Sequence, residues 1–203
     1  MKMKLEEMNK ELRNKHPKEI IAWAIEQGKN PVLTTNFSPY EATILHAVST
    51  QKKDIPVIWC DSGYNTRETY LHAERTIKQL GLNIDLYVPK QTVAHRNVTL
   101  GIPEIDTPDH DEFTRQVKLE PFARAMAHHQ PDVWFTNLRK DQTAFRAGLD
   151  IVTEANGILK IAPFFYWTSE ELDGYLTENN LETEVKYYDP TKALANRECG
   201  LHT

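Results

Sequence analysis

The residues with the clearest capacity for chemistry lie near the end of the 203-residue chain, where Cys199 is flanked by Arg197-Glu198 and by Gly200-Leu201-His202. A thiolate is a strong nucleophile, and the charges of Arg197 and His202 favour ionisation of the Cys199 thiol, whereas Glu198 opposes it. The polar surroundings predict an accessible thiol. Two interpretations follow from these residues alone: a nucleophile in covalent catalysis, or an incidental thiol in a surface tail.

A candidate anion site lies at Ser38-Pro39-Tyr40-Glu41, directly after an apolar segment. Ser38 suits a helix N-cap, Pro39 the first helical position and Glu41 the third, so we expect a helix to begin here. The free N–H groups of a helix N-terminus bind phosphate or sulfate. An ordinary helix cap is the alternative, because the loop lacks glycine and Glu41 adds negative charge.

Two more polar segments follow apolar ones. In Asp61-Ser62-Gly63-Tyr64 the small residues let a ligand approach the backbone closely, although a tight turn explains them equally. In the segment 137–146, Arg139 and Arg146 are able to converge on one anion, and Gln142 lies between them. A solvated charged loop is the alternative there.

Apolar segments alternate with helical patterns along most of the chain. Strands are expected at Pro31–Thr35, Ile55–Cys60, Ile84–Val88 and Val133–Thr136, and a hairpin around Asn156-Gly157 at Ile151–Ala155 and Ile158–Ile161. Helices are expected at Leu5–Asn14, Pro17–Gln27, after Ser38, at Asn65–Leu80 with Asn65 and Glu68 as a capping box, at Glu112–His129, and from Thr168 to Glu178. Gly101–Asp111 is interpreted as a surface loop and Leu181–Thr203 as an extended tail.

This alternation predicts a three-layer α/β fold, a mostly parallel sheet with helices on both faces. In such a sheet the carboxyl ends of the strands lie along one edge, which brings the polar loops together. We expect N-terminal helices over 1–29, a nucleotide-binding domain over 30–180 and a tail over 181–203.

Composition narrows the classes of function. The chain is 40% hydrophobic and 26% charged, enough for a core without metal or disulfide, and its net charge of -5 argues against a general nucleic-acid or membrane-surface binder. No apolar run approaches a membrane span, and the charged N-terminus lacks a signal peptide, so we expect a cytoplasmic protein. The two cysteines, Cys60 and Cys199, should be free thiols and are too few for a four-thiolate zinc or iron–sulfur site.

Taken in order, five sequence elements resemble the phosphoadenosine phosphosulfate (PAPS) reductase family over roughly Asn30 to Thr203. The elements are Leu33-Thr34-Thr35-Asn36-Phe37-Ser38, Asp61-Ser62-Gly63-Tyr64 with Glu68-Thr69-Tyr70, Lys118-Leu119-Glu120-Pro121, Trp134 with Leu138-Arg139-Lys140-Asp141-Gln142-Thr143 and Arg146, and Arg197-Glu198-Cys199-Gly200-Leu201-His202. The terminal Glu-Cys-Gly-Leu-His is the most specific of them.

The resemblance implies an adenine nucleotide alpha hydrolase-like (PP-loop) fold whose tail carries a nucleophilic Cys199. That cysteine would attack the sulfonate sulfur of PAPS, releasing adenosine 3′,5′-bisphosphate, and thioredoxin or glutaredoxin would then release sulfite for cysteine biosynthesis. Binding roles are implied for Thr35, Asn36, Phe37, Ser38, Asp61, Ser62, Gly63, Lys118, Arg139, Gln142, Arg146, Arg197 and His202. The resemblance implies no bound cofactor or metal, and a homodimer is compatible with it.

This sequence departs from the family pattern in three places. Phe37-Ser38 stands where Phe-Gly is usual, Arg139-Lys140-Asp141-Gln142-Thr143 where Arg-Arg-x-Gln-Ser is usual, and the segment before Cys199 is short. Members that reduce adenosine phosphosulfate (APS) often hold a [4Fe-4S] cluster, so the lack of cluster cysteines favours PAPS as substrate. The alternatives are a cluster-free APS reductase, an adenylyltransferase that uses ATP, and a nucleotide-binding remnant of the same fold.

Overall fold

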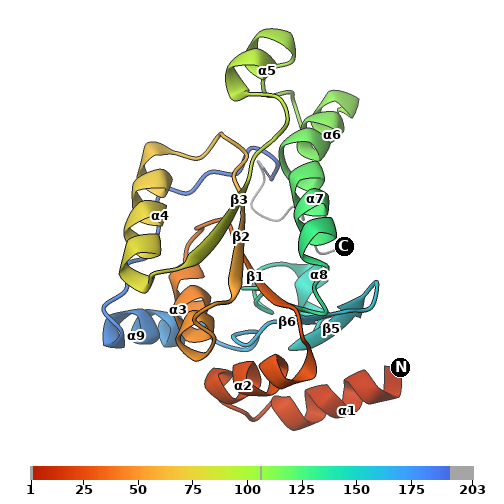
Figure 1. The fold of residues 1–203 in the computed structure, drawn as a ribbon, viewed down its shortest axis with the longest axis vertical. Helices are drawn as coiled ribbons and strands as arrows, with labels where there is room; N and C mark the ends of the chain where they lie inside the picture. The colour runs from red at the N-terminus through yellow and green to blue at the C-terminus, as the bar shows by residue number, and fades with distance from the viewer. Residues whose placement is uncertain (1, 106, 193–203) are drawn as a thin grey trace.

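A computed structural model describes residues 2–105 and 107–192, and it is built around one sheet (Figure 1). Within these ranges the sheet has six strands in the order β3-β2-β1-β4-β6-β5. Every neighbouring pair is parallel except β5 and β6, which form an antiparallel hairpin. The strands are β1 (Pro31–Thr35), β2 (Pro56–Cys60), β3 (Asn83–Tyr87), β4 (Val133–Phe135), β5 (Val152–Ala155) and β6 (Ile158–Ile161).

Helices cover both faces of the sheet, as Figure 1 shows, with α3 and α4 on one side and α6 and α7 on the other. Their bounds are α1 (Lys2–Leu12), α2 (Pro17–Gln27), α3 (Glu41–Gln51), α4 (Arg67–Leu80), α5 (Val93–Thr99), α6 (Pro108–Thr114), α7 (Glu120–His129), α8 (Ala144–Ala147) and α9 (Ser169–Glu178). A π-helical turn, η1 (Arg115–Leu119), joins α6 to α7. The three-layer, mostly parallel α/β fold predicted from the sequence is confirmed.

The core divides at the sheet, because successive residues of a strand face opposite sides. Leu33 belongs to the large cluster under α2, α3 and α9, whereas its neighbour Val32 packs with Trp134 and Ala125 on the side of α7. The apolar runs of the central strands therefore reflect burial on both faces. The rigid sheet fixes the starting point of every loop at its carboxyl edge.

Several local predictions are confirmed. Helix α2 and strand β1 have the expected bounds, and Asn156 and Gly157 form the hairpin turn with φ of 53° and 78°. Thr168 and Glu171 form the expected capping box of α9.

Other local predictions are wrong. Ser38 does not cap α3: the helix begins at Glu41, and Tyr40 occupies the N-cap in the left-handed region without a side-chain cap. Helix α4 is capped by Thr66 rather than Asn65, whose side chain donates to Asp61 instead.

The region between β3 and α7 also differs from the prediction. Residues 93–99 form α5, and α6 begins at Pro108, inside the expected loop. The helix expected from Glu112 is interrupted by η1, which adds a residue to one turn. Neither α5 nor α6 has the long apolar stripe on which the prediction relied.

Candidate active site

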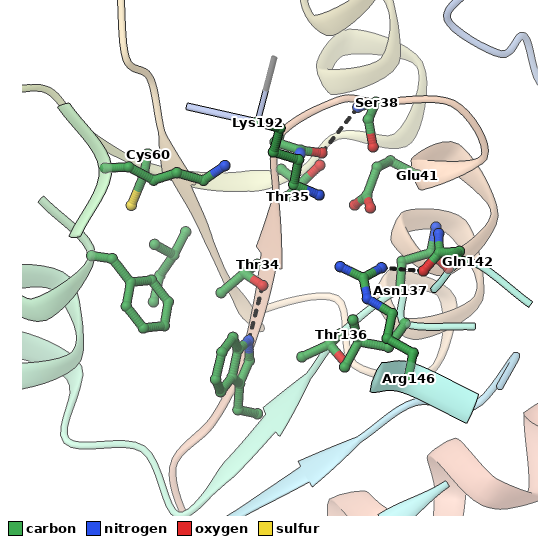
Figure 2. Close-up of a pocket in the computed structure, with 16 residues that line it drawn as sticks. Thr34, Thr35, Ser38, Glu41, Cys60, Thr136, Asn137, Gln142, Arg146 and Lys192 are labelled. Carbon is green, nitrogen blue, oxygen red and sulfur yellow. Dashed lines mark hydrogen bonds between the residues drawn. The ribbon is translucent and has the colours of Figure 1, made fainter. Parts of the chain in front are cut away.

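A cavity of about 130 Å³ lies at the carboxyl ends of the central strands (Figure 2). Its floor is formed by Thr34 and Thr35 of β1, Ile58 and Cys60 of β2, and Trp134 of β4. Polar and charged side chains surround this floor: Asn36, Ser38, Glu41, Lys118, Thr136, Asn137, Gln142, Arg146 and Lys192. In parallel α/β proteins, ligands bind at this edge of the sheet, outside the carboxyl ends of the strands.

The β1–α3 loop is held in a strained shape at the rim of this cavity. Phe37 and Tyr40 have φ of 53° and 67°, a region that large side chains rarely adopt. Asn36 Oδ1 accepts from the Ser38 backbone N–H at 3.1 Å, and Thr35 Oγ1 accepts from the Phe37 N–H at 3.0 Å. Such strain occurs at ligand-binding loops, where the surrounding structure imposes it.

A buried guanidinium forms one wall of the cavity. Arg146 is 6% exposed, and its Nη1 donates to Oε1 of Gln142. The same Gln142 oxygen accepts from the Arg139 backbone N–H at 3.0 Å, so it fixes the loop after β4. A guanidinium held in a partly dry cavity binds oxyanions with charge-assisted, bidentate hydrogen bonds.

Glu41 lies on the opposite wall, 8% exposed, and its Oε2 has no hydrogen-bond partner among the described residues. Burial raises the pKa of Glu41 to about 7, and the polar and cationic neighbours Thr35, Asn137, Lys192 and Arg146 oppose this only in part. Burial therefore disfavours the ionised form of Glu41 near neutral pH. Figure 2 shows its carboxyl group and the Arg146 guanidinium reaching into the same space.

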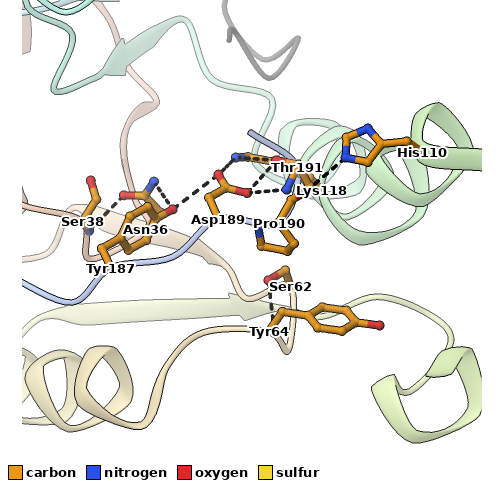
Figure 3. A network of polar contacts seen from close by, with 10 residues as sticks. All are labelled: Asn36, Ser38, Ser62, Tyr64, His110, Lys118, Tyr187, Asp189, Pro190 and Thr191. Atoms are coloured by element: carbon orange, nitrogen blue, oxygen red, sulfur yellow. Dashed lines mark hydrogen bonds and ion pairs between the residues drawn. The ribbon is translucent and has the colours of Figure 1, made fainter. Parts of the chain in front are cut away.

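The third wall is closed by the irregular segment 181–192, which we call the strap (Figure 3). Asn36 Nδ2 donates to the Tyr187 hydroxyl at 2.8 Å, and that hydroxyl donates to Asp189 at 3.4 Å. Asp189 forms a buried ion pair with Lys118 of η1. The strap thus crosses from the β1–α3 loop to η1 and forms part of the wall of the cavity.

The loop after β2 lies beside the cavity but does not line it. Asp61 accepts from the Gly63 backbone N–H at 2.8 Å, from Asn65 at 2.8 Å and from the Tyr70 hydroxyl at 2.9 Å. Gly63 has a φ of 81°. The Asp61 carboxylate thus organises the loop from within, as in a tight turn.

Six of the predicted site residues meet around the cavity, and the others that belong to the described residues do not line it. The six are Thr35, Asn36, Ser38, Lys118, Gln142 and Arg146. Phe37 is fully buried against Trp59 in the core, and Arg139 stacks over Tyr40 and donates to Ser169. Asp61, Ser62 and Gly63 are in the neighbouring loop, while Arg197, Cys199 and His202 lie outside the described residues.

Sequence reasoning missed Asn137 and Lys192, and it treated Glu41 only as a capping residue. Asn137 follows β4 at the sheet edge, so the rule that located Thr35 would also have found it. Lys192 lies in a segment without periodicity and offered no such signal. Within the described residues, no group of three or more His, Cys, Asp or Glu is arranged to hold a metal ion.

Comparison with known proteins agrees with this geometry. Residues 30–189 match the model of the phosphoadenosine phosphosulfate reductase domain. The chain belongs to the PAPS reductase family. It is 32% identical to the phosphoadenosine 5′-phosphosulfate reductase of Vibrio campbellii over 181 residues, 88% of this chain and 70% of that protein. It is 30% identical to that of Aliivibrio salmonicida in an alignment of 225 positions, gaps included, that covers 98% of this chain and 88% of that protein.

Solved structures extend the comparison to the fold. The crystal structure of the PAPS reductase from Candida auris, a phosphate complex, superposes with a TM-score of 0.76 at 26% identity, covering 88% of this chain and 86% of that one. An FMN adenylyltransferase from Candida glabrata, 13% identical, superposes with a TM-score of 0.58 over 82% of this chain and 54% of its own. This member of the PAPS reductase family therefore has the PP-loop nucleotide-binding fold and is an oxidoreductase of the sulfate-reducing type. None of the helices in its described part is long and apolar enough to cross a membrane.

Proposed function

We propose that this enzyme reduces PAPS to sulfite and adenosine 3′,5′-bisphosphate, with Cys199 as the nucleophile and thioredoxin or glutaredoxin as the electron donor. The reaction would serve assimilatory sulfate reduction and cysteine biosynthesis. The family, and the cavity at the sheet edge that Arg146, Lys118 and Lys192 line, support this substrate class.

The observation that carries the proposal is the position of Lys192. This last residue of the strap lines the cavity, and Cys199 follows seven residues later in the sequence. Seven residues span at most about 25 Å when extended. The segment that bears the Cys199 thiol therefore starts at the cavity, and its length would allow the thiol to reach a ligand bound there.

The other cysteine is unsuited to the attack. Cys60 lies at the end of β2, and burial raises the pKa of its thiol to about 12 despite the nearby charges of Lys118 and Arg124. A thiol that stays protonated at neutral pH is a poor nucleophile. Cys199, flanked by Arg197 and His202, is the better candidate.

In the first step, the Cys199 thiolate forms a bond to the sulfonate sulfur, and the bond from that sulfur to the bridging oxygen of the nucleotide breaks. The nucleotide keeps the electron pair of the broken bond and leaves as adenosine 3′,5′-bisphosphate. Arg146, Lys118 and the polar side chains of Thr35, Asn36 and Ser38 would hold the charged oxygens. Asp61, Ser62 and Gly63 would border the adenosine.

In the second step, a thiolate of thioredoxin or glutaredoxin attacks Sγ of Cys199, and the bond between Sγ and the sulfonate breaks to release sulfite. A second thiol of the donor then displaces Cys199 from the mixed disulfide. The donor is oxidised to its disulfide, and Cys199 returns as a thiolate.

The decisive experiment omits the reductant. The enzyme is incubated with PAPS or with APS separately, and its intact mass and cysteine peptides are measured. A sulfonate adduct on the Cys199 peptide with PAPS, but not with APS, is expected, and Cys199→Ser should lose the adduct while keeping affinity for adenosine 3′,5′-bisphosphate. An adduct on Cys60, or sulfite release by Cys199→Ser with thioredoxin, would refute the mechanism.

A further inference from the structure

We propose that the structure contains a second anion site, between α5 and η1, that binds a tetrahedral oxyanion such as phosphate or sulfate. A cavity of about 320 Å³ lies there, lined by Lys90, Gln91, Arg96, Arg115, Gln116 and Glu120. These residues include none of those that line the active-site cavity. The proposal does not depend on the reaction proposed above.

The anchor of this site is Arg96, which is only 1% exposed. Its Nε donates to Oε1 of Gln116 at 3.2 Å and its Nη2 to the carbonyl of Gln91 at 3.1 Å. Among the described residues, its Nη1 has no hydrogen-bond partner, and no carboxylate forms an ion pair with Arg96. A buried charge without a counter-ion is costly, so an anionic partner at Nη1 would stabilise this guanidinium.

The charges around the cavity do not balance either. The groups that line it or pair with its lining residues are the cations Lys90, Arg96, Arg115 and Arg124 and the carboxylates Glu112 and Glu120. Four positive and two negative charges leave an excess of two positive charges. This excess matches a doubly charged oxyanion, and the planar guanidinium groups match its geometry.

Two of the cations are able to turn toward such an ion. The side chains of Lys90 and Arg115 are 79% and 57% exposed, and they pair at the surface with Glu120 and Glu112. Exposed ion pairs of this kind contribute little to stability, so exchanging them for an oxyanion on Arg96 costs little. Arg96 would supply the fixed donor, and Lys90 and Arg115 would close over the ion.

The two elements that such an ion would connect also flank the active site. Helix α5 contacts the loop after β2, because Asn97 accepts from the Tyr64 hydroxyl at 2.9 Å. The turn η1 carries Lys118, which lines the active-site cavity. A bound oxyanion would therefore tie the loop beside the cavity to the element that supplies one of its cations.

The test uses the Cys199→Ser protein, so that turnover plays no part. Inorganic phosphate and sulfate are titrated separately at constant ionic strength set with chloride, and the Arg96 Nε–H and Gln116 side-chain amide resonances are followed by NMR. A saturable shift is expected with one or both ions, and which ion saturates identifies the ligand. The backbone amides of Asn36 and Ser38 report any binding in the active-site cavity separately.

Two variants test whether the NMR shifts come from an ion bound at Arg96. Lys90→Gln combined with Arg115→Gln removes two exposed charges and should weaken binding at Arg96 at least about tenfold, because two charge-assisted contacts are lost. Lys18→Gln on α2 removes one exposed charge elsewhere and should leave the affinity unchanged. The proposal is overturned if chloride alone produces the same shifts, if neither ion produces a saturable one, or if the double variant binds as tightly as the parent.

Discussion

Replacing Glu41 with Gln should stabilise the protein at alkaline pH and have much less effect in acid. The Glu41 carboxyl is buried beside the active-site cavity, and one of its oxygens has no hydrogen-bond partner among the described residues. Burial therefore penalises its ionised form. Gln keeps the shape and the polarity of the side chain but cannot ionise, so the comparison isolates the cost of the charge.

The size of the effect follows from the two pKa values. The pKa of Glu41 rises from 4.5 to about 7 on folding. Below pH 4.5 both states hold the proton; between pH 4.5 and 7 the unfolded state loses it first, so the wild-type free energy of unfolding falls as the pH rises. The difference of about 2.5 pH units corresponds to ~3 kcal/mol, fully developed only above pH 7.

The assay is urea unfolding of both proteins at pH 4.5 and pH 8, followed by tryptophan fluorescence. The free energy of unfolding of Glu41→Gln minus that of wild type should be about 3 kcal/mol larger at pH 8 than at pH 4.5. The pH dependence of all other groups cancels in this difference. An equal difference at the two pH values would show that Glu41 ionises normally and that burial in the cavity wall does not penalise its charge.

The same proton should couple to ligand binding. Phosphate bound beside Arg146 would repel an ionised Glu41, so binding near pH 7 should be accompanied by proton uptake. Calorimetry in two buffers of different ionisation enthalpy measures this uptake. Proton uptake of the same size in Glu41→Gln would assign it to another group.

Three more substitutions test the structure around the cavity. Asp189→Asn leaves Lys118 without its buried carboxylate and should cost about 3 kcal/mol in urea unfolding, whereas an exposed pair would cost almost nothing. Gly63→Ala forces a Cβ into the side chain of Val93 at a φ of 81°, so it should destabilise by about 2 kcal/mol and weaken nucleotide affinity in calorimetry. Phe37→Ala should cost about 3–5 kcal/mol because the ring is wholly buried, and a loss of ligand affinity without a loss of melting temperature would show that Phe37 contacts the ligand instead.

The sheet was predictable because its strands are short apolar runs bounded by turn residues. Strand β1 occupies 31–35 as expected, and the Asn156-Gly157 turn supplied the two positive φ angles that fix the hairpin. Helix α5 was not predictable in this way. Its one fully buried side chain is Arg96, so tertiary contacts determine its position and no apolar stripe marks it.

Within the candidate site, only the residues at the carboxyl ends of the strands were predictable from the sequence. Thr35 ends strand β1, and Gln142 and Arg146 come after strand β4, so the carboxyl edge of the parallel sheet brings the three together. The left-handed Tyr40 was not foreseeable, because the Ser-Pro sequence before it suits a helix start equally well. The path of the strap was not foreseeable either, since the bond between Asn36 and Tyr187 joins residues 151 positions apart.

The pKa values of two buried carboxylates at this cavity are shifted in opposite directions. Burial alone would raise the pKa of Asp189, but Lys118 and Thr191 hold it below its ordinary value, so Asp189 stays ionised and keeps the strap docked. For Glu41, burial outweighs the polar and cationic neighbours, so its raised pKa favours uptake of a proton when negative charge arrives. We therefore expect an anion to be accommodated by protonation of Glu41 rather than by release of Asp189. The strap, and with it the origin of the segment that carries Cys199, would stay in place as the substrate binds.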